Sequence, residues 1–432
     1  MSWADLIRFC RLPLSERNFV LFAIACIVLT RVAVILLTPH SANLPDIRIY
    51  QATGQVVLAG VNPYNFADSP DVRRALKNQT AITQNFIAQT QKRWDYYVSS
   101  NLPASTALYA VLEKISRGSI LIWRLFFILG DVVIFLGLMA FFRTIRGTVT
   151  NAGDQIGIFC LSVLYPALIV NGTAQPEDKQ FQTALLLFSA ALLLSRKPTT
   201  TARGLWTGFV LSLSVLFKMF GIFLLPLWVE RARQEWPRFP LWTALGGLVP
   251  LVLSFIAFGT YFVTTMVARA SENSIGSALH GSPWTLFAGL SQYELLTARV
   301  VVLLPLGIVL IALLLKRRID LMNLCAALAV MFACIWLDKG SLDRMNITII
   351  FAIAALVTLS PQQFLVLTLL ATVVSGITYL FGVGLFKSHV ETADAGITLV
   401  LVCAYFGTLI GGGWWRTLPL LEIQPEGPGS SP

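Results

Sequence analysis

Residues 120–142 read ILIWRLFFILGDVVIFLGLMAFF, a stretch in which only Arg124 and Asp131 are charged. A helix needs about 20 apolar residues to cross a bilayer, because it rises about 1.5 Å per residue and the hydrocarbon layer is about 30 Å thick. The stretch is long enough and apolar enough to be a transmembrane helix. It decides the fold class, because similar stretches recur along almost the whole chain.

Apolar segments of this kind follow one another from residue 19 to residue 410, and two of them are short. They are residues 19–37, 120–142, 156–170, 181–194, 205–217, 222–229, 241–262, 300–315, 321–337, 347–359, 364–386 and 397–410. The composition agrees, because 56% of the residues are apolar, 12% are charged and the mean hydropathy is +0.72. The sequence therefore predicts an all-α, polytopic membrane protein with about twelve transmembrane helices.

The basic residues predict how the chain is oriented. The net charge of +10 comes from Lys and Arg that cluster in short loops between the apolar segments. Most of them fall in loops on the same side as the N-terminus, so the positive-inside rule places both termini in the cytoplasm. We interpret the charge as a topology signal and not as a nucleic-acid surface. A multi-pass protein of a bacterial plasma membrane is expected.

This orientation requires residues 205–217 and 222–229 to cross the membrane out and back, with a break around residues 218–221. Interrupted helices are tolerated in a membrane only where the freed backbone faces protein or a watery cavity. We therefore expect Lys218 to line a cavity that opens to the outside.

The first outer loop, residues 38–119, is the one large segment outside the predicted membrane. It is expected to hold short juxtamembrane helices rather than a separate domain. Residues 104–115 have apolar side chains at helical spacing, which predicts a helix lying along the membrane surface. Residues 424–432 are rich in Pro, Gly and Ser and are expected to be a disordered tail.

The clearest motifs begin after the first predicted helix. Residues 45–50 read PDIRIY and residues 59–64 read AGVNPY. Further motifs follow, namely NLP at 101–103, Arg124 with Asp131, YP at 165–166 before Asn171, QPED at 175–178 and FKM at 217–219 before Pro226. In this order the motifs resemble the glycosyltransferase C superfamily, especially its polyprenol-phosphate-mannose-dependent mannosyltransferases and the catalytic subunit of GPI mannosyltransferase I.

The resemblance covers residues 1–230, while residues 231–423 match the family in hydropathy alone. It implies a glycosyltransferase module in the first part, followed by C-terminal helices. It also implies that a hexose, mannose by resemblance, moves from a polyprenyl-phosphate donor to a lipid or glycan acceptor on the outer face. The family resemblance implies Asp46 as the general base of an inverting reaction that uses no metal or other cofactor.

The chemistry of such a transfer favours the same residues. An acceptor hydroxyl is a poor nucleophile, and a carboxylate that takes its proton speeds the displacement by about 10²- to 10⁴-fold. Asp46 suits this role, because it lies just beyond the predicted membrane edge. The leaving lipid phosphate needs cations at the same depth. We expect these to be Arg48, Lys218, Arg124 and Arg299, and expect the substrate to contact Tyr50, Tyr64, Glu177, Asp178 and His280.

Other interpretations apply to some of these features. Arg31 and Asp131 fall at mid-depth on the first two helices and are expected to form a structural ion pair. The six cysteines and three histidines lack the spacing of a metal site, so no metal is predicted. A secondary transporter or a lipid or glycan flippase would also have about twelve helices. Transporters often have two similar halves, whereas the large first loop has no counterpart in the second half of this chain.

Overall fold

The computed structural model describes residues 13–38, 45–64, 70–76, 101–174, 176, 178–195, 197–218, 220–264, 308 and 361–380. Within these ranges every regular element is a helix and there is no strand. Four stretches are long and apolar enough to cross a membrane, namely α2 (Glu16–Leu37), α7 (Ile120–Arg146), the run through α8 and α9 (Ala152–Ile169) and α13 (Arg238–Phe258). The chain is therefore an α-helical membrane protein, which confirms the predicted fold class.

The number of twelve spans and the side of each terminus stay predictions. The predicted spans 300–315, 321–337, 347–359 and 397–410 lie outside the described residues, apart from Ile308, and so does the tail 424–432.

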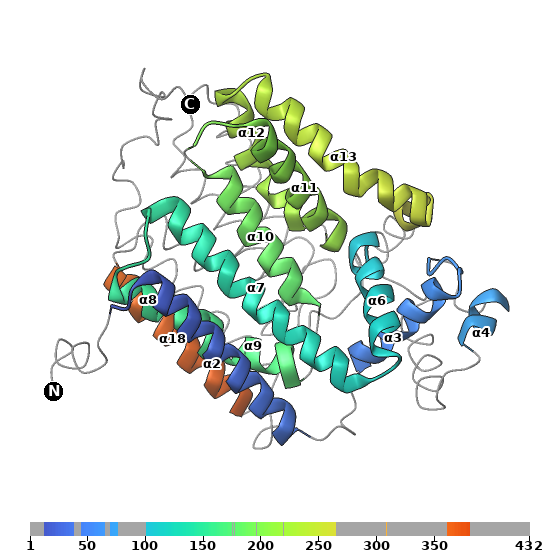
Figure 1. Ribbon diagram of the computed structural model, residues 1–432, viewed down its shortest axis with the longest axis horizontal. Coiled ribbons are helices and arrows are strands. Elements are labelled where there is room, and N and C mark those ends of the chain that lie inside the picture. Colours follow the sequence, from blue (N-terminus) through green and yellow to red (C-terminus); the bar gives the residue numbers. More distant parts are fainter. Residues whose placement is uncertain are drawn as a thin grey trace, which may run out of the picture.

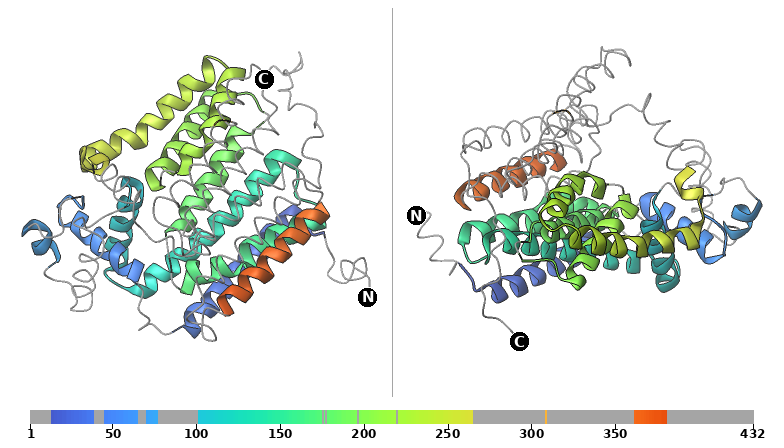
Figure 2. Two further views of the ribbon diagram at one scale, coloured as in Figure 1. Left: turned by 180° about the vertical axis from the view of Figure 1, so that it is seen from behind. Right: turned by 90° about the horizontal axis from the view of Figure 1, so that it is seen from above.

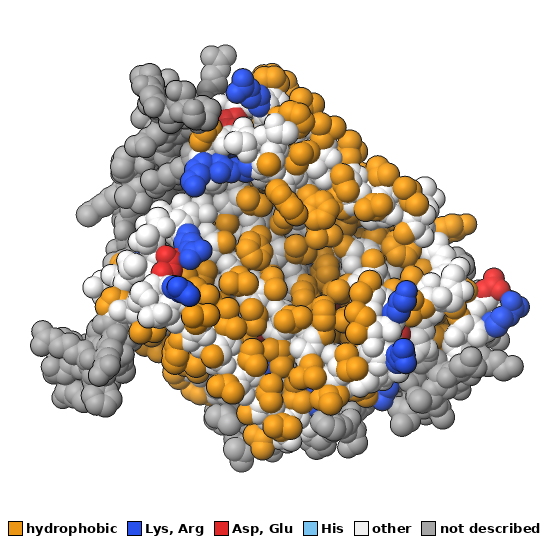
Figure 3. Space-filling model, viewed as in Figure 1, with side chains coloured by type: hydrophobic (Ala, Val, Ile, Leu, Met, Phe, Trp, Pro, Cys, Tyr) orange, Lys and Arg blue, Asp and Glu red, His pale blue; other side chains and the backbone are white. Residues whose placement is uncertain are grey.

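On the face seen in Figure 3, charged side chains gather at the ends of the helical bundle, with a broad apolar belt between them. At one end, Arg143 in the last turn of α7 pairs with Glu16 in the first turn of α2. Arg146 pairs there with Asp154, which lies in the first turn of α8 (Ala152–Phe159). Basic residues in the last turn of a helix and acidic residues in the first turn also suit the helix dipole. We call this the basic end.

Helix α10 (Lys179–Leu193) lies along α7 and runs in the same direction, so it also ends at the basic end (Figure 1). Gly130 of α7 lies against Gln180, and Gly137 lies against Leu187. A Cβ added at Gly137 would come within 3.0 Å of the Leu187 side chain. These glycines therefore allow the two helices to pack closely around the apolar core of the bundle.

The predicted break around residues 218–221 is confirmed. Helix α11 (Thr201–Lys218) ends there, and the chain continues through a short 3₁₀ helix, η3 (Phe220–Leu224), into α12 (Leu225–Gln234). At the end of α12, Arg231 donates to the backbone carbonyls of Ser195 and Lys197, which precede α11. The chain thus leaves the basic end along α11 and returns to it along α12.

Glycines also bring α11 against α13. A Cβ on Gly208 would lie 1.9 Å from the carbonyl oxygen of Thr243, and one on Gly246 would lie 2.0 Å from that of Leu205. The Ser212 hydroxyl adds a hydrogen bond of 2.9 Å to the carbonyl of Gly247. Small residues of this kind let membrane helices approach closely, because lipid provides no hydrophobic force between them.

The predicted span 156–170 is a broken helix. It consists of α8, a π-helical turn η1 (Cys160–Leu164), α9 (Pro166–Ile169) and a second π-helical turn η2 (Val170–Ala174). Pro166 has no N–H, so the carbonyl of Ser162 loses its ordinary helical partner. A buried backbone carbonyl needs a replacement in a membrane.

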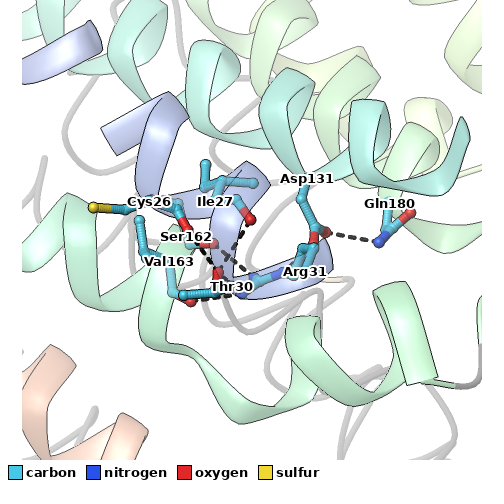
Figure 4. A network of polar contacts seen from close by, with 8 residues as sticks. All are labelled: Cys26, Ile27, Thr30, Arg31, Asp131, Ser162, Val163 and Gln180. Atoms are coloured by element: carbon cyan, nitrogen blue, oxygen red, sulfur yellow. Dashed lines mark hydrogen bonds and ion pairs between the residues drawn. The ribbon is translucent and has the colours of Figure 1, made fainter. Parts of the chain in front are cut away.

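Arg31 of α2 supplies that replacement, as Figure 4 shows. Its guanidinium donates to the carbonyls of Ser162 at 3.1 Å and Val163 at 2.8 Å. Its Nε also donates to Asp131 Oδ2 of α7 at 2.6 Å, and both side chains are fully buried. Gln180 of α10 completes the network with a 2.7 Å bond to Asp131 Oδ1. The predicted structural ion pair is confirmed, and we call these contacts the inner network.

The elements of the first predicted loop lie together at the end of the bundle opposite the basic end (Figure 1). They are α3 (Pro45–Leu58), α4 (Pro70–Leu76) and α6 (Pro103–Ser116). The predicted helix over residues 104–115 is therefore confirmed. One face of α6 packs on α3 and α7, while Val111 and Ile115 on the other face are exposed, as a helix at a membrane surface requires.

Helix α18 (Pro361–Leu380) covers the predicted span 364–386 in part. It lies on the opposite side of the bundle from α2 (Figure 2). Gly153 and Gly157 of α8 contact its residues Pro361 and Phe364, so α18 and α8 run in the same direction. That direction is the one the predicted topology gives to the eleventh span.

Candidate active site

Four helices converge on one buried carboxylate at the end opposite the basic end. Asp178 is the residue before α10, and its side chain has no exposed surface. Its Oδ1 accepts from Lys218 Nζ at 2.5 Å and from the Tyr50 hydroxyl at 3.3 Å. Its Oδ2 accepts from the Tyr109 hydroxyl at 2.5 Å. We call Asp178, Lys218, Tyr50 and Tyr109 the outer cluster.

The outer cluster joins three predicted site residues. Tyr50 and Asp178 were expected to contact substrate and Lys218 to contact phosphate, and the structure places all three in direct contact. The three residues are 40 or more positions apart in the sequence, Tyr50 in α3, Asp178 directly before α10 and Lys218 at the end of α11. Glu177, predicted alongside Asp178, lies outside the described residues.

Tyr109 is a site residue that the sequence analysis missed. Its ring stacks on that of Tyr50, with ring centroids 4.4 Å apart and planes at 15°, and Trp123 and Phe127 pack beside them. Burial in this apolar setting raises the pKa of the Tyr109 phenol well above its ordinary value, and the negative charge of Asp178 raises it further. The phenol therefore stays protonated and acts as a hydrogen-bond donor. The sequence feature that could have identified Tyr109 is its position on the buried face of the predicted helix 104–115.

Lys218 is the more accessible member of its ion pair. It is the last residue of α11, directly before the break, and its side chain is 20% exposed. The carbonyl of the preceding residue, Phe217, accepts from the Ser105 hydroxyl of α6 at 3.3 Å. The ring of Phe217 also packs on Phe181 of α10. These contacts hold the end of α11 beside α6 and α10.

Asp46 lies one helical turn from the outer cluster. It is in the first turn of α3, four residues before Tyr50, and it is half-buried. Residues four apart share one face of a helix and are about 6 Å apart along its axis. A negative side chain is also favoured in the first turn by the helix dipole. The predicted base and the predicted phosphate ligand therefore lie at the same end of the molecule.

The contact between α3 and α6 sets the positions of both tyrosines. Gly54 of α3 sits where a Cβ would come within 2.6 Å of the Tyr109 carbonyl oxygen. Next to it, the buried carboxylate of Glu113 accepts from Gln55 Nε2 at 2.6 Å and from Trp123 Nε1 at 3.2 Å. These neutral donors join α3, α6 and α7. Any change in the crossing at Gly54 would therefore move the tyrosines that hold Asp178.

Two of the predicted phosphate ligands, Arg124 and Arg48, contact protein groups, and their binding of phosphate stays a prediction. Arg124 is fully buried and donates to the backbone carbonyls of Thr173 at 3.2 Å and Thr38 at 3.5 Å, which joins η2 to the end of α2. Arg48 donates to Gln51 on its own helix at 3.1 Å. Because Arg48 is two residues from Asp46, it lies on a different face of α3. Neither arginine contacts the outer cluster.

Tyr64, whose contact with substrate stays a prediction, is also held by protein groups. Its hydroxyl donates to the carbonyl of Asn101 at 2.9 Å, and burial raises the pKa of this phenol. Its ring packs edge-on against Phe258 at the end of α13. The hydrogen bond from Tyr64 to Asn101 therefore connects the turn after α3 to the residues just before α6. The remaining predicted site residues, His280 and Arg299, lie outside the described residues.

Among the residues that the structure describes, no group of three or more His, Cys, Asp or Glu side chains is placed to hold a metal ion. No protein-family model matches the chain, and no curated protein matches it significantly in sequence. The fold and the site thus define an α-helical membrane protein with a buried Asp, Lys and Tyr cluster at one end. The resemblance to the glycosyltransferase C superfamily rests on the motifs alone and stays a proposal.

Proposed function

We propose that the protein is a membrane glycosyltransferase that moves a hexose, mannose by resemblance, from a polyprenyl-phosphate donor to a lipid or glycan acceptor. The observation that carries the proposal is that Lys218 belongs to the same cluster as Tyr50, which lies one turn of α3 after Asp46. A base and a phosphate-binding cation at the same end of a membrane protein are what such a transfer needs.

The proposed reaction is a single inverting displacement at the anomeric carbon of the sugar. Asp46 takes the proton of the acceptor hydroxyl as its oxygen forms the new bond to that carbon. The bond from the carbon to the phosphate oxygen breaks, and its electron pair leaves with the lipid phosphate. Lys218 stabilises the negative charge that develops on the phosphate.

The proposed orientation places this end outside the cytoplasm. Arg143, Arg146 and Arg231 lie at the basic end, where short loops are rich in Lys and Arg. The positive-inside rule assigns such loops to the cytoplasm. A donor in the outer leaflet would then present its sugar phosphate at the depth of α3 and α6.

The proposal is tested with the full-length protein in lipid nanodiscs. Radiolabelled polyprenyl-phosphate mannose, glucose or arabinose is incubated with candidate lipid and glycan acceptors, and transferred label is measured. We expect Asp46→Asn to lower the rate by about 10²-fold or more while membrane insertion is unchanged. Asp71→Asn is the matched control, because Asp71 is an acid of the same predicted loop with a 66% exposed side chain.

Full activity of Asp46→Asn would remove Asp46 from the mechanism. Absence of transfer with all donors, together with movement of a lipid-linked sugar across the membrane of proteoliposomes, would favour a flippase instead.

A further inference from the structure

Lys218, the proposed phosphate-binding residue of the outer cluster, is already paired with an anion in the structure. Lys218 Nζ lies 2.5 Å from Asp178 Oδ1, the distance of a close ion pair. An ammonium group in this position already has an anionic acceptor. A lipid phosphate that approached Lys218 would compete with the carboxylate of Asp178 for this ammonium group.

The two tyrosines make such a replacement feasible. An ionised carboxylate without partners is strongly disfavoured in a buried site. If Lys218 turned away, Asp178 would keep the hydroxyl of Tyr109 on Oδ2 and that of Tyr50 on Oδ1. Hydrogen bonds from neutral donors would therefore still stabilise its charge.

Lys218 is also the partner that is free to move. Its side chain is 20% exposed, whereas that of Asp178 is fully buried. A lysine has a flexible four-carbon stem and a compact charge that can turn between acceptors. Asp178 is held by α3 and α6 through the tyrosines, so the exchange would leave the carboxylate in place.

We propose that Asp178 is an internal competitor for the lipid phosphate: it neutralises Lys218 when the donor is absent, the phosphate displaces it, and Tyr50 and Tyr109 hold the released carboxylate. This inference rests on the proposed function in one respect, namely that the ligand is a lipid phosphate. It assigns Tyr109 as a positioning residue that acts through Asp178.

The test measures binding of farnesyl phosphate, a short polyprenyl phosphate without a sugar, to the full-length protein in nanodiscs. Asp178→Asn removes the competing charge, so we expect it to tighten binding by about tenfold, which corresponds to about 1.4 kcal/mol. Tyr109→Phe makes release of the carboxylate harder and should weaken binding several-fold. Lys218→Gln should weaken it by about tenfold or more.

Two controls separate the lysine from general charge effects. Lys114→Gln removes an exposed positive charge from α6 and should leave the affinity unchanged. Farnesol, which lacks the phosphate, should bind all variants equally. A merely structural role for Asp178 predicts lower thermal stability with no gain in phosphate affinity.

The outcomes distinguish this inference from the proposed function. If the unmodified protein binds farnesyl phosphate and Asp178→Asn binds it no more tightly, the competition is overturned while the glycosyltransferase proposal stands. If neither binds, the competition is overturned, and the transfer assay decides the glycosyltransferase proposal. If Asp178→Asn does not fold, Tyr109→Phe decides: weaker binding supports the competition, and unchanged or tighter binding overturns it.

Discussion

In the described part of the chain, two ion pairs have a fully buried carboxylate, and they differ in how their cations are held. Arg31 in the inner network is fully buried and donates to Asp131 and to the backbone carbonyls of Ser162 and Val163. Lys218 in the outer cluster is partly exposed, and within the described part of the chain Asp178 is the one acceptor to which it donates.

The difference follows from the chemistry of the two cations. A guanidinium has five donors in a rigid plane, so it can bind a carboxylate and two carbonyls at once. Such a group cannot leave one acceptor without losing the others. A lysine with a single acceptor can exchange it for another anion. The inner network therefore fixes the fold, and the outer cluster is suited to binding.

The largest predicted effect breaks the inner network. Arg31→Met leaves Asp131 as a buried charge without its cation, which typically costs about 3–5 kcal/mol. It also frees the carbonyls of Ser162 and Val163. We expect little folded protein in the membrane, measured by detergent-resistant yield and thermal unfolding. Arg31→Met combined with Asp131→Leu should recover much of the loss, and a double variant as unstable as the single one would contradict the ion-pair account.

The same substitution at the outer cluster should do less harm to stability. Lys218→Met leaves Asp178 with two phenol donors, so we expect a loss of about 1–3 kcal/mol. Thermal unfolding of the two methionine variants, side by side, checks the order. An equal loss for Lys218→Met and Arg31→Met would mean that both pairs are structural, and the comparison would fail.

The sequence predicted the inner network better than the outer cluster. Arg31 and Asp131 are charged residues inside apolar stretches, and such residues must find partners within the bundle. Lys218 stood out for the same reason, and its position at a helix break followed from the topology. Tyr109 carries no charge and looks like an ordinary core residue of α6. Its role depends on an approach between α3 and α6 that no local pattern encodes.

The contacts of Arg124 could not be predicted for a related reason. Its acceptors are the Thr38 hydroxyl and the backbone carbonyls of Thr38 and Thr173, and any residue could supply the two carbonyls. They are available because α2 ends at Leu37 and because residues 170–174 form a π-helical turn. The sequence predicts the end of the first span at residue 37 but treats residues 156–170 as one continuous span, so it does not show that Thr38 and Thr173 both approach Arg124.

A change at the α3 and α6 crossing should affect the outer cluster selectively. In Gly54→Ala, the new methyl group would lie 2.6 Å from the Tyr109 carbonyl oxygen, so the helices must separate. Overpacking of this kind lowers the free energy of unfolding by about 1–3 kcal/mol. The hydrogen bonds from Tyr50 and Tyr109 to Asp178 should weaken as the helices move apart. We expect a large fall in the rate of sugar transfer and only a small fall in the unfolding temperature. Gly247→Ala is the control, because its Cβ would make its closest contact at 3.4 Å, an ordinary van der Waals distance. Equal losses of transfer activity in the two variants would refute the selectivity.

High pH should reveal the buried phenols. The raised pKa of Tyr109 means that the folded protein keeps this proton where the unfolded chain releases it. The contribution of this phenol to the free energy of unfolding is therefore complete below about pH 10, the ordinary pKa of tyrosine, and it falls as the pH rises above that value. We expect Tyr109→Phe to lose less stability than the unmodified protein over that range, measured by unfolding temperature. Tyr64→Phe should act similarly, and identical pH profiles for all three proteins would contradict the burial of these hydroxyls.

The smallest predicted effect concerns two buried glutamines on α10, Gln180 and Gln182. Gln180 donates to Asp131 at 2.7 Å, whereas Gln182 is fully buried and, within the residues that the structure describes, neither end of its amide has a hydrogen-bond partner. Gln182→Leu removes an unsatisfied polar group and should raise stability by up to about 1 kcal/mol, while Gln180→Leu should lower it. Thermal unfolding of the two variants measures the difference. If Gln182→Leu instead weakens farnesyl phosphate binding, then the outer cluster extends one turn further along α10 than Asp178, since residues 178 and 182 share a face of that helix.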